Sequence, residues 1–186
     1  MTLKLYQYQK QIMDRRENEG LNYVLHNIEL PLLPILEDME RCGVNMNMGM
    51  IKQLYDKYEA DLKIAEQKVY DQIKPHEDKI EEYRIKHYNK KLDNPILLSS
   101  PSQLSILFYD ILHYKTKSGK GTGVSELQEI NTPLTMALLD YRKLSKIIDA
   151  FLVSLPKKVS SFDGKIHTSL NQVGAETGRF SSSNPK

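Results

Sequence analysis

An apolar stripe between residues 51 and 73 constrains the fold of this chain more than any other feature. Its apolar side chains recur every three or four residues, and charged residues such as Lys57 and Glu66 occupy positions between them. This period predicts one long amphipathic helix that buries one face and exposes the other. Asn47 is a suitable N-cap for that helix, and Pro75 is expected to end it. The stripe consists of Ile51, Leu54, Tyr58, Leu62, Ala65, Val69 and Ile73.

Three further segments have helical spacing. One runs from residue 22 to 42, with a kink or restart expected near Pro31 and a stop at Gly43. A shorter one begins at Ser100-Pro101-Ser102-Gln103, which has the form of a capping box with proline at the first helical position. A second long helix is expected to open at Thr132-Pro133.

The apolar period changes near the C-terminal end of the chain. Asp163-Gly164 is a hairpin turn signal, and Ile166, Thr168 and Leu170 alternate as in a strand. The predicted fold class is therefore mainly α, in the α+β sense. We expect a helical arm with two long helices, followed by a short C-terminal β-hairpin.

Composition limits the classes of protein to which the chain can belong. Its 186 residues have room for one domain, or for one domain and part of another. A formal net charge of +2 is too small to imply nucleic-acid binding, so an electrostatic argument must rest on local clusters. The single Cys42 excludes a disulfide framework, and no apolar run suits a signal peptide or a membrane span. We expect a soluble, cytoplasmic chain with no membrane partner.

The loop from Lys115 to Gly123 is the strongest local candidate for a binding site. It contains three lysines and three glycines and no acidic residue. Glycines let the backbone approach a phosphate, lysines supply charge, and Thr122 is expected to cap the following helix. The loop lacks the spacing of a P-loop. A flexible, solvated connector is the alternative interpretation.

Two other positions suit contacts with phosphates or bases. Ser99 and Ser100 lie at an expected helix start, where hydroxyls and free N–H groups can bind phosphate, although simple capping also explains them. Arg179 follows Gly178 in an extended segment, so its guanidinium could reach a base edge or a phosphate. A plain surface arginine remains the alternative.

No motif predicts a catalytic centre or a metal site within the chain. The histidines lack metal-ligand spacing, and one cysteine cannot form a structural zinc site. The acidic cluster between Glu77 and Glu82 is typical of a solvated helix face. Ser169 lies beside His167 but lacks the Gly-x-Ser-x-Gly elbow and a third member. We therefore expect no catalytic residue, metal ligand or bound cofactor in this chain.

Five segments match one set of motifs in chain order. Residues 28–44 resemble E-x-P-L…E-x-x-G-V, and residues 98–104 resemble L-S-S-x-x-Q-L. The Lys115–Gly123 loop resembles the tip of a thumb subdomain. Residues 141–156 resemble Y-R-x-L-x-K…L-P, and residues 166–182 resemble h-H-T…T-G-R-h-S-S, where h is apolar. Together these segments resemble family A DNA polymerases of the polymerase I type.

The resemblance implies a division of the chain and a set of DNA contacts. Residues 1–27 would be the C-terminal helix of an exonuclease-like domain and a linker, 28–156 a helical thumb region, and 157–186 the start of an incomplete palm. The thumb would hold primer–template duplex, and Arg179 would lie in the minor groove near the primer terminus. The implied DNA-binding residues are Ser99, Ser100, Lys117, Gly119, Lys120, Thr122, Arg179, Ser181, Ser182 and Lys186.

Some positions depart from the family pattern. Leu97 and Ile148 stand where many members have an Asn and a Lys directed at DNA, so those contacts are expected to be lost or made differently. Lys186 stands where the family usually has an Asn near the template. The charged stretch around Pro75–Lys91 is longer than in typical bacterial members, which suggests a phage-like sequence.

The resemblance also implies what the parent protein does. The parent would be a DNA-directed DNA polymerase that uses Mg²⁺, with its metal-binding aspartates beyond Lys186, in the cytoplasm of a bacterial or phage-infected cell. Its remaining palm and fingers would be partners of this segment, and the 186-residue chain alone is expected to add no nucleotide. An autonomous non-enzymatic DNA-binding or accessory module is one alternative, and a helical interaction protein is another.

Overall fold

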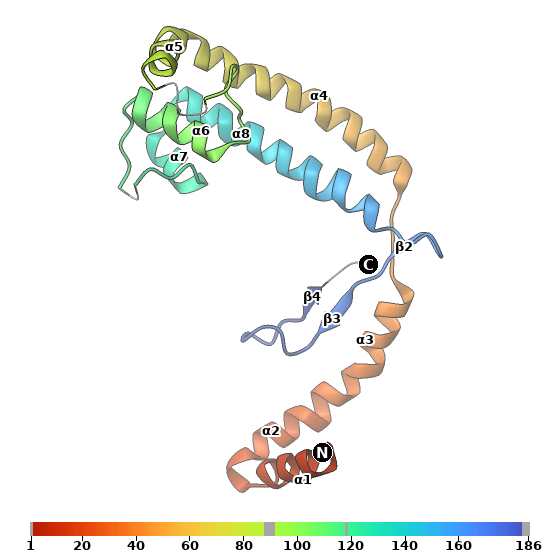
Figure 1. Cartoon of the computed structure of the whole chain (residues 1–186). Coiled ribbons are helices and arrows are strands. Elements are labelled where there is room, and N and C mark those ends of the chain that lie inside the picture. The colour runs from red at the N-terminus through yellow and green to blue at the C-terminus, as the bar shows by residue number, and fades with distance from the viewer. Residues whose placement is uncertain (1, 88–91, 118, 184–186) are drawn as a thin grey trace. The chain divides into compact units, whose positions relative to one another are not determined.

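The computed structural model describes residues 2–87, 92–117 and 119–183, which form two compact units (Figure 1). Unit 1 comprises residues 1–47 together with 156–186, and unit 2 comprises residues 48–155. The predicted fold class is confirmed: the described chain is mainly helical and adds two small antiparallel sheets.

Unit 2 is entirely helical in its described regular structure, and its two longest helices run side by side in opposite directions (Figure 1). The predicted long helix begins directly after Asn47 and ends before Pro75, as the sequence indicates. All seven residues of its stripe are buried or half-buried. The elements are α4 (Met48–Ile73), the 3₁₀ turn η3 (Lys74–His76), α5 (Glu77–Lys86), α6 (Pro101–Ser105), the π-helical η4 (Ile106–Ile111), α7 (Val124–Ile130), α8 (Pro133–Ile147) and the π-helical η5 (Ile148–Ser154).

The core of unit 2 lies where the C-terminal half of α4 meets the shorter helices and the start of α8. Burial of each large apolar side chain there contributes about 1.5–3 kcal/mol to stability. These contributions hold the short α6 and α7 in place, although neither is long enough to be stable as an isolated helix. The side chains with less than 2% exposure include Val69, Leu104, Leu107, Phe108, Leu127 and Leu138.

Both predicted helix starts carry caps, but they differ from each other. At the start of α8, Thr132 and Thr135 form a reciprocal capping box, with Oγ1 of each within 3.0–3.3 Å of the other's main-chain nitrogen. At α6, Ser100 caps Gln103, but the Gln103 amide does not reach back to Ser100. Gln103 instead accepts from the Leu97 N–H at 3.0 Å and donates to the Asp93 carboxylate at 2.7 Å. This buried amide therefore fixes the segment that leads into α6.

Unit 1 combines N-terminal helices with the C-terminal strands. The helix predicted over residues 22–42 ends at Cys42, and Gly43 follows with φ +64°, as predicted. The restart expected near Pro31 takes the form of a π turn that leads directly into the next α-helix. The elements are α1 (Thr2–Met13), the 3₁₀ turn η1 (Arg16–Asn18), α2 (Glu19–Val24), the π turn η2 (Leu25–Glu29), α3 (Leu30–Cys42), β1 (Val44–Asn45), the 3₁₀ turn η6 (Pro156–Lys158), β2 (Lys165–Ile166), β3 (Ser169–Asn171) and β4 (Ser181–Ser183).

The strand pairing corrects one prediction. Asp163-Gly164 does not close a hairpin, because the turn leads into β2, and β2 pairs antiparallel with β1 from the N-terminal part of the chain. The C-terminal hairpin consists of β3 and β4, with Leu170 opposite Ser182. The Asp163 carboxylate accepts from the Lys165 N–H at 3.2 Å and pairs with His167 Nε2 at 2.9 Å. The turn signal was correct, but local alternation cannot identify a distant partner strand.

Candidate nucleic-acid interface

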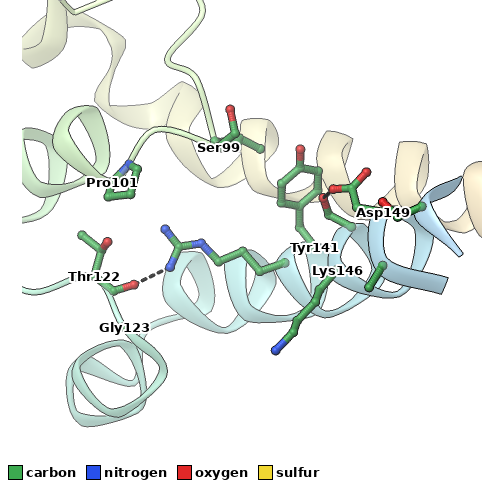
Figure 2. A pocket seen from close by; sticks show the side chains of 12 residues that line it. Ser99, Pro101, Thr122, Gly123, Tyr141, Lys146 and Asp149 are labelled. Carbon is green, nitrogen blue, oxygen red and sulfur yellow. Dashed lines mark hydrogen bonds between the residues drawn. The ribbon is translucent and has the colours of Figure 1, made fainter. Parts of the chain in front are cut away.

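An open groove of about 710 Å³ lies in unit 2, between the start of α6, the segment before α7, and one side of α8 and η5 (Figure 2). It brings together two predicted binding residues from separate parts of the sequence, Ser99 and Thr122. Ser99 is exposed and Thr122 is half-buried. The groove therefore joins two of the segments that the sequence selected independently.

Arg142 on α8 supplies the groove with a positive charge. Its Nη1 donates a hydrogen bond to the main-chain carbonyl of Thr122, shown as the dashed line in Figure 2. Among the described residues its side chain has no other hydrogen bond and no ion pair. Burial lowers the pKa of Arg142 from its usual value, but a guanidinium stays protonated at neutral pH. The groove thus contains a half-buried cation that no described carboxylate neutralises.

Other polar side chains line the same groove. Lys146 is exposed and lies one helical turn beyond Arg142, and in Figure 2 it points away from Tyr141 and Asp149. The Asp149 carboxylate accepts from the Ser145 hydroxyl at 3.3 Å. Burial, with smaller contributions from Glu66 and Asp149, raises the pKa of Tyr141, so its hydroxyl stays a neutral donor. Hydroxyl donors and two cations suit an anion with several acceptor oxygens.

The lysine- and glycine-rich loop is held by acidic residues from neighbouring elements. The Lys120 ammonium lies 2.5 Å from the Asp110 carboxylate of η4. The Lys117 main-chain N–H donates to the Glu129 carboxylate of α7 at 3.1 Å, while the Lys117 side chain is exposed. Gly119 has φ +98°, a conformation that a residue with a side chain rarely adopts. The loop is therefore braced by neighbouring helices, although its own sequence contains no acid.

The predicted capping role of Thr122 is wrong. The next helix, α7, begins at Val124, so Gly123 occupies the N-cap position, and it provides no side-chain cap. Thr122 contributes its carbonyl to Arg142 instead. The start of this helix lies one residue later than a Thr122 cap would require.

The remaining predicted residues lie in unit 1. Arg179 is exposed, in the segment between β3 and β4 and two residues before β4 begins. Ser181 and Ser182 belong to β4, where Ser181 is half-buried and Ser182 exposed. Gly174 lies directly against Ser181, since a Cβ at this glycine would overlap the serine Oγ. Lys186 lies outside the described residues.

Sequence reasoning did not select Arg142 or Lys146 as site residues. Both belong to the Y-R-x-L-x-K segment, and their spacing of four places them on one face of a helix. That spacing was the available signal. The partner of Arg142 is a main-chain carbonyl 20 residues earlier, which no sequence pattern indicates.

The described part of the chain contains neither a metal-binding cluster nor a membrane-spanning helix. No cluster of three or more His, Cys, Asp or Glu side chains there is arranged to hold a metal ion. No described helix is both long enough and apolar enough to cross a membrane. The described residues thus do not supply a ligand cluster for the Mg²⁺ ion implied for the parent.

Comparisons with known proteins give consistent matches. The family model described as DNA polymerase family A matches residues 49–186. DNA polymerase I of Treponema pallidum is 32% identical over 191 residues, covering 100% of this chain and 17% of the relative. DNA polymerase I of Pseudomonas aeruginosa is 30% identical over 197 residues, covering 100% of this chain and 19% of the relative. The chain thus spans less than a fifth of the length of these curated relatives.

A solved structure is similar as well. It is the POL domain of Pol1 from M. smegmatis, in complex with DNA primer-template and dNTP. The TM-score is 0.60 at 30% sequence identity, and the match covers 86% of this chain and 26% of that one.

Proposed function

Because the chain belongs to DNA polymerase family A, we propose that it is the segment of a template-directed DNA polymerase that grips primer–template duplex. Unit 2 is the body of the thumb region, whose predicted range is 28–156, and the strands of unit 1 begin the palm. The parent adds nucleotides with its remaining palm and fingers, using Mg²⁺. The relatives named above are bacterial, and the setting proposed is the cytoplasm of a bacterial or phage-infected cell.

The observation that carries this proposal is the unneutralised guanidinium in the groove of unit 2. A half-buried charge without a counter-ion is unfavourable in the free protein, and a bound phosphate removes that cost. Arginine is suited to this role because its planar fork can donate two hydrogen bonds to one phosphate. Arg142 already uses one N–H for the Thr122 carbonyl and retains others for a ligand.

Further contacts with the DNA backbone come from the residues around the groove and from the Lys115–Gly123 loop. Lys146 and the Ser99 hydroxyl extend the groove, and Ser100 and Thr122 lie beside them. Lys117, Gly119 and Lys120 supply charge and close backbone approach at the loop. Contacts of this kind position a duplex without reading its sequence, as a polymerase requires.

In unit 1, we assign Arg179 to the minor groove near the primer terminus, with Ser181, Ser182 and Lys186 close to the DNA path. The minor groove presents similar acceptors for A·T and T·A pairs, so an arginine there accepts either order. The exposure of Arg179 and its lack of a protein partner among the described residues support this assignment.

Replacement of Arg142 tests the proposal. Fluorescence anisotropy of a labelled primer–template duplex, recorded between about 50 and 200 mM salt, gives the dependence of log K on log salt. Arg142→Ala should weaken binding about tenfold or more, and should reduce the slope by about 0.9 if one phosphate contact is lost.

Lys57→Ala is the matched control, because it removes the same charge from an exposed position on α4 that does not line the groove. Its slope should equal that of the wild type. Unchanged slope and affinity in Arg142→Ala would remove the groove from the interface. Absence of any binding to the duplex would instead favour a helical interaction protein.

A further inference from the structure

Two glutamates of the segment that resembles E-x-P-L…E-x-x-G-V have no role in the groove. Both make defined contacts with the C-terminal hairpin inside unit 1. Glu40 Oε1 accepts a hydrogen bond from the Leu170 N–H at 2.5 Å. Glu29 Oε2 accepts from the Gln172 side-chain amide at 2.7 Å, and the Glu29 carbonyl accepts from the same amide at 3.1 Å.

The two glutamates present their carboxylates along one face of a helix. Glu29 ends the π turn η2 and Glu40 lies in the last turns of α3, about three helical turns later. Glu40 makes a third contact through its main chain, because its carbonyl oxygen is 2.8 Å from Nδ1 of His167. The continuous helical segment η2–α3 thus contacts the chain at His167, Leu170 and Gln172, of which Leu170 lies in β3 and the other two lie just outside its ends.

Apart from the β1–β2 ladder, which holds residues 165–166 just before β3, the hairpin has few contacts of its own that could fix it. Each strand has three residues, and β4 is Ser181-Ser182-Ser183, which has no apolar side chain to bury. Leu170 is only half-buried, and Val173 in the connecting segment is 90% exposed. An isolated two-stranded hairpin is marginal in water even with better side chains. Beyond the β1–β2 ladder, the charge-assisted bonds from the helix are therefore the constraint that acts on β3 itself and on the segment that follows it.

The hydrogen-bonding pattern of β3 also indicates that Glu40 holds this strand in place. Leu170 is opposite Ser182 in the register of β3 and β4. Its N–H nevertheless points to the Glu40 carboxylate, so it faces the open edge of β3. A free edge N–H would otherwise be left to solvent or to another strand. Glu40 satisfies it and fixes the lateral position of the strand.

We propose that Glu29 and Glu40 are positioning residues that hold the β3–β4 hairpin so that Arg179 is presented to the primer end. The inference rests on the proposed function only for the role of Arg179. Anchoring of the hairpin is a separate property that can be measured without DNA.

Hydrogen exchange in the whole chain tests the anchoring. In Glu40→Ala the Leu170 amide should exchange about tenfold faster or more, because its acceptor is lost. Glu40→Gln keeps a side-chain carbonyl oxygen and should restore most of the protection. Glu37→Ala, on the exposed side of α3 and without a side-chain hydrogen bond among the described residues, is the control and should exchange like the wild type. Equal exchange in all four proteins would overturn the inference.

A double-mutant cycle tests the link to Arg179. The measured quantity is the ratio of affinities for a paired and a frayed primer end. Arg179→Ala and Glu40→Ala should each lower this ratio. In the Arg179→Ala background, Glu40→Ala should have no further effect. Fully additive effects would mean that Glu40 does not act through Arg179, and would overturn the proposed link between the anchor and the primer end.

The two failures can be told apart. If the wild type shows no preference for a paired end while Glu40→Ala still speeds exchange at Leu170, the assigned role of Arg179 fails and the anchor stands. If the wild type discriminates but exchange at Leu170 does not respond to Glu40→Ala, the anchor fails and the proposed function stands.

Discussion

Replacing Asp110 with asparagine should increase the affinity for duplex DNA. In the free protein the Lys120 ammonium is paired with the Asp110 carboxylate at 2.5 Å, and the Tyr83 hydroxyl donates to the other carboxylate oxygen at 3.2 Å. A phosphate that binds Lys120 must therefore compete with an internal partner. The asparagine side chain would keep an oxygen for the Tyr83 hydroxyl but would lack the charge that retains Lys120.

The exposure of the pair sets the size of the effect. The Lys120 side chain is 65% exposed and that of Asp110 is 23% exposed, so the pair belongs with surface ion pairs rather than buried ones. Such pairs contribute about 0.2–1 kcal/mol. If that energy opposes binding, its removal should raise the affinity by roughly 1.4- to 5-fold. The stability of unit 2 should fall by no more than about 1 kcal/mol.

Anisotropy titrations at one fixed salt concentration measure this gain, with Asp61→Asn as the control. Asp61 is exposed on α4 and has no ion pair among the described residues, so this change alters the net charge equally. Asp110→Asn should exceed the control, and the excess should vanish when Lys120 is also replaced by alanine. An equal gain in the Lys120→Ala background, or a gain no larger than that of Asp61→Asn, would refute the reasoning.

Two further predictions concern unit 1. Gly43→Ala should destabilise unit 1 by about 1–3 kcal/mol in a denaturant titration, because φ is +64° and an added Cβ would lie 2.7 Å from His167 Cε1; an unchanged midpoint would contradict this. His167 hydrogen-bonds the Glu40 carbonyl and the Asp163 carboxylate. Both bonds raise the pKa of His167 above the usual 6.5, and the bond to Glu40 has the larger effect. The stability that protonated His167 adds to unit 1 is therefore fully present below pH 6.5 and is lost as pH rises through the raised pKa. Over that range, exchange of the Leu170 amide should accelerate by more than the intrinsic pH dependence of amide exchange. His167→Gln should lack this excess acceleration, and an equal excess in both proteins would exclude His167 as its source.

The helices could be predicted because their signals are local. The stripe from Ile51 to Ile73 has one period, and Pro75 interrupts the backbone hydrogen-bond pattern, so α4 has the expected limits. Thr132 likewise starts α8 through contacts with a residue three positions away. In each case the residues that decide the structure lie within the helix itself or within a few positions of its ends.

The strands and part of the site could not be predicted in this way. The partner of β2 is the two-residue strand β1, far away in the sequence, and neither strand has enough residues to give a pattern. Arg142 looks like any helical arginine until the fold brings the Thr122 carbonyl to it. Lys120 looked like a free cation because the loop has no acid, whereas Asp110 comes from another element. Long-range pairing decides each of these cases.

The salt dependence of duplex binding by the wild-type chain is the most direct test of the central claim. Four cations are assigned to phosphates, namely Arg142, Lys146, Lys117 and Lys120. At about 0.9 for each contact, the slope of log K against log salt should be about −3.6 or steeper. A slope near zero, or no binding of primer–template duplex at low salt, would contradict the claim that this segment grips DNA through its backbone.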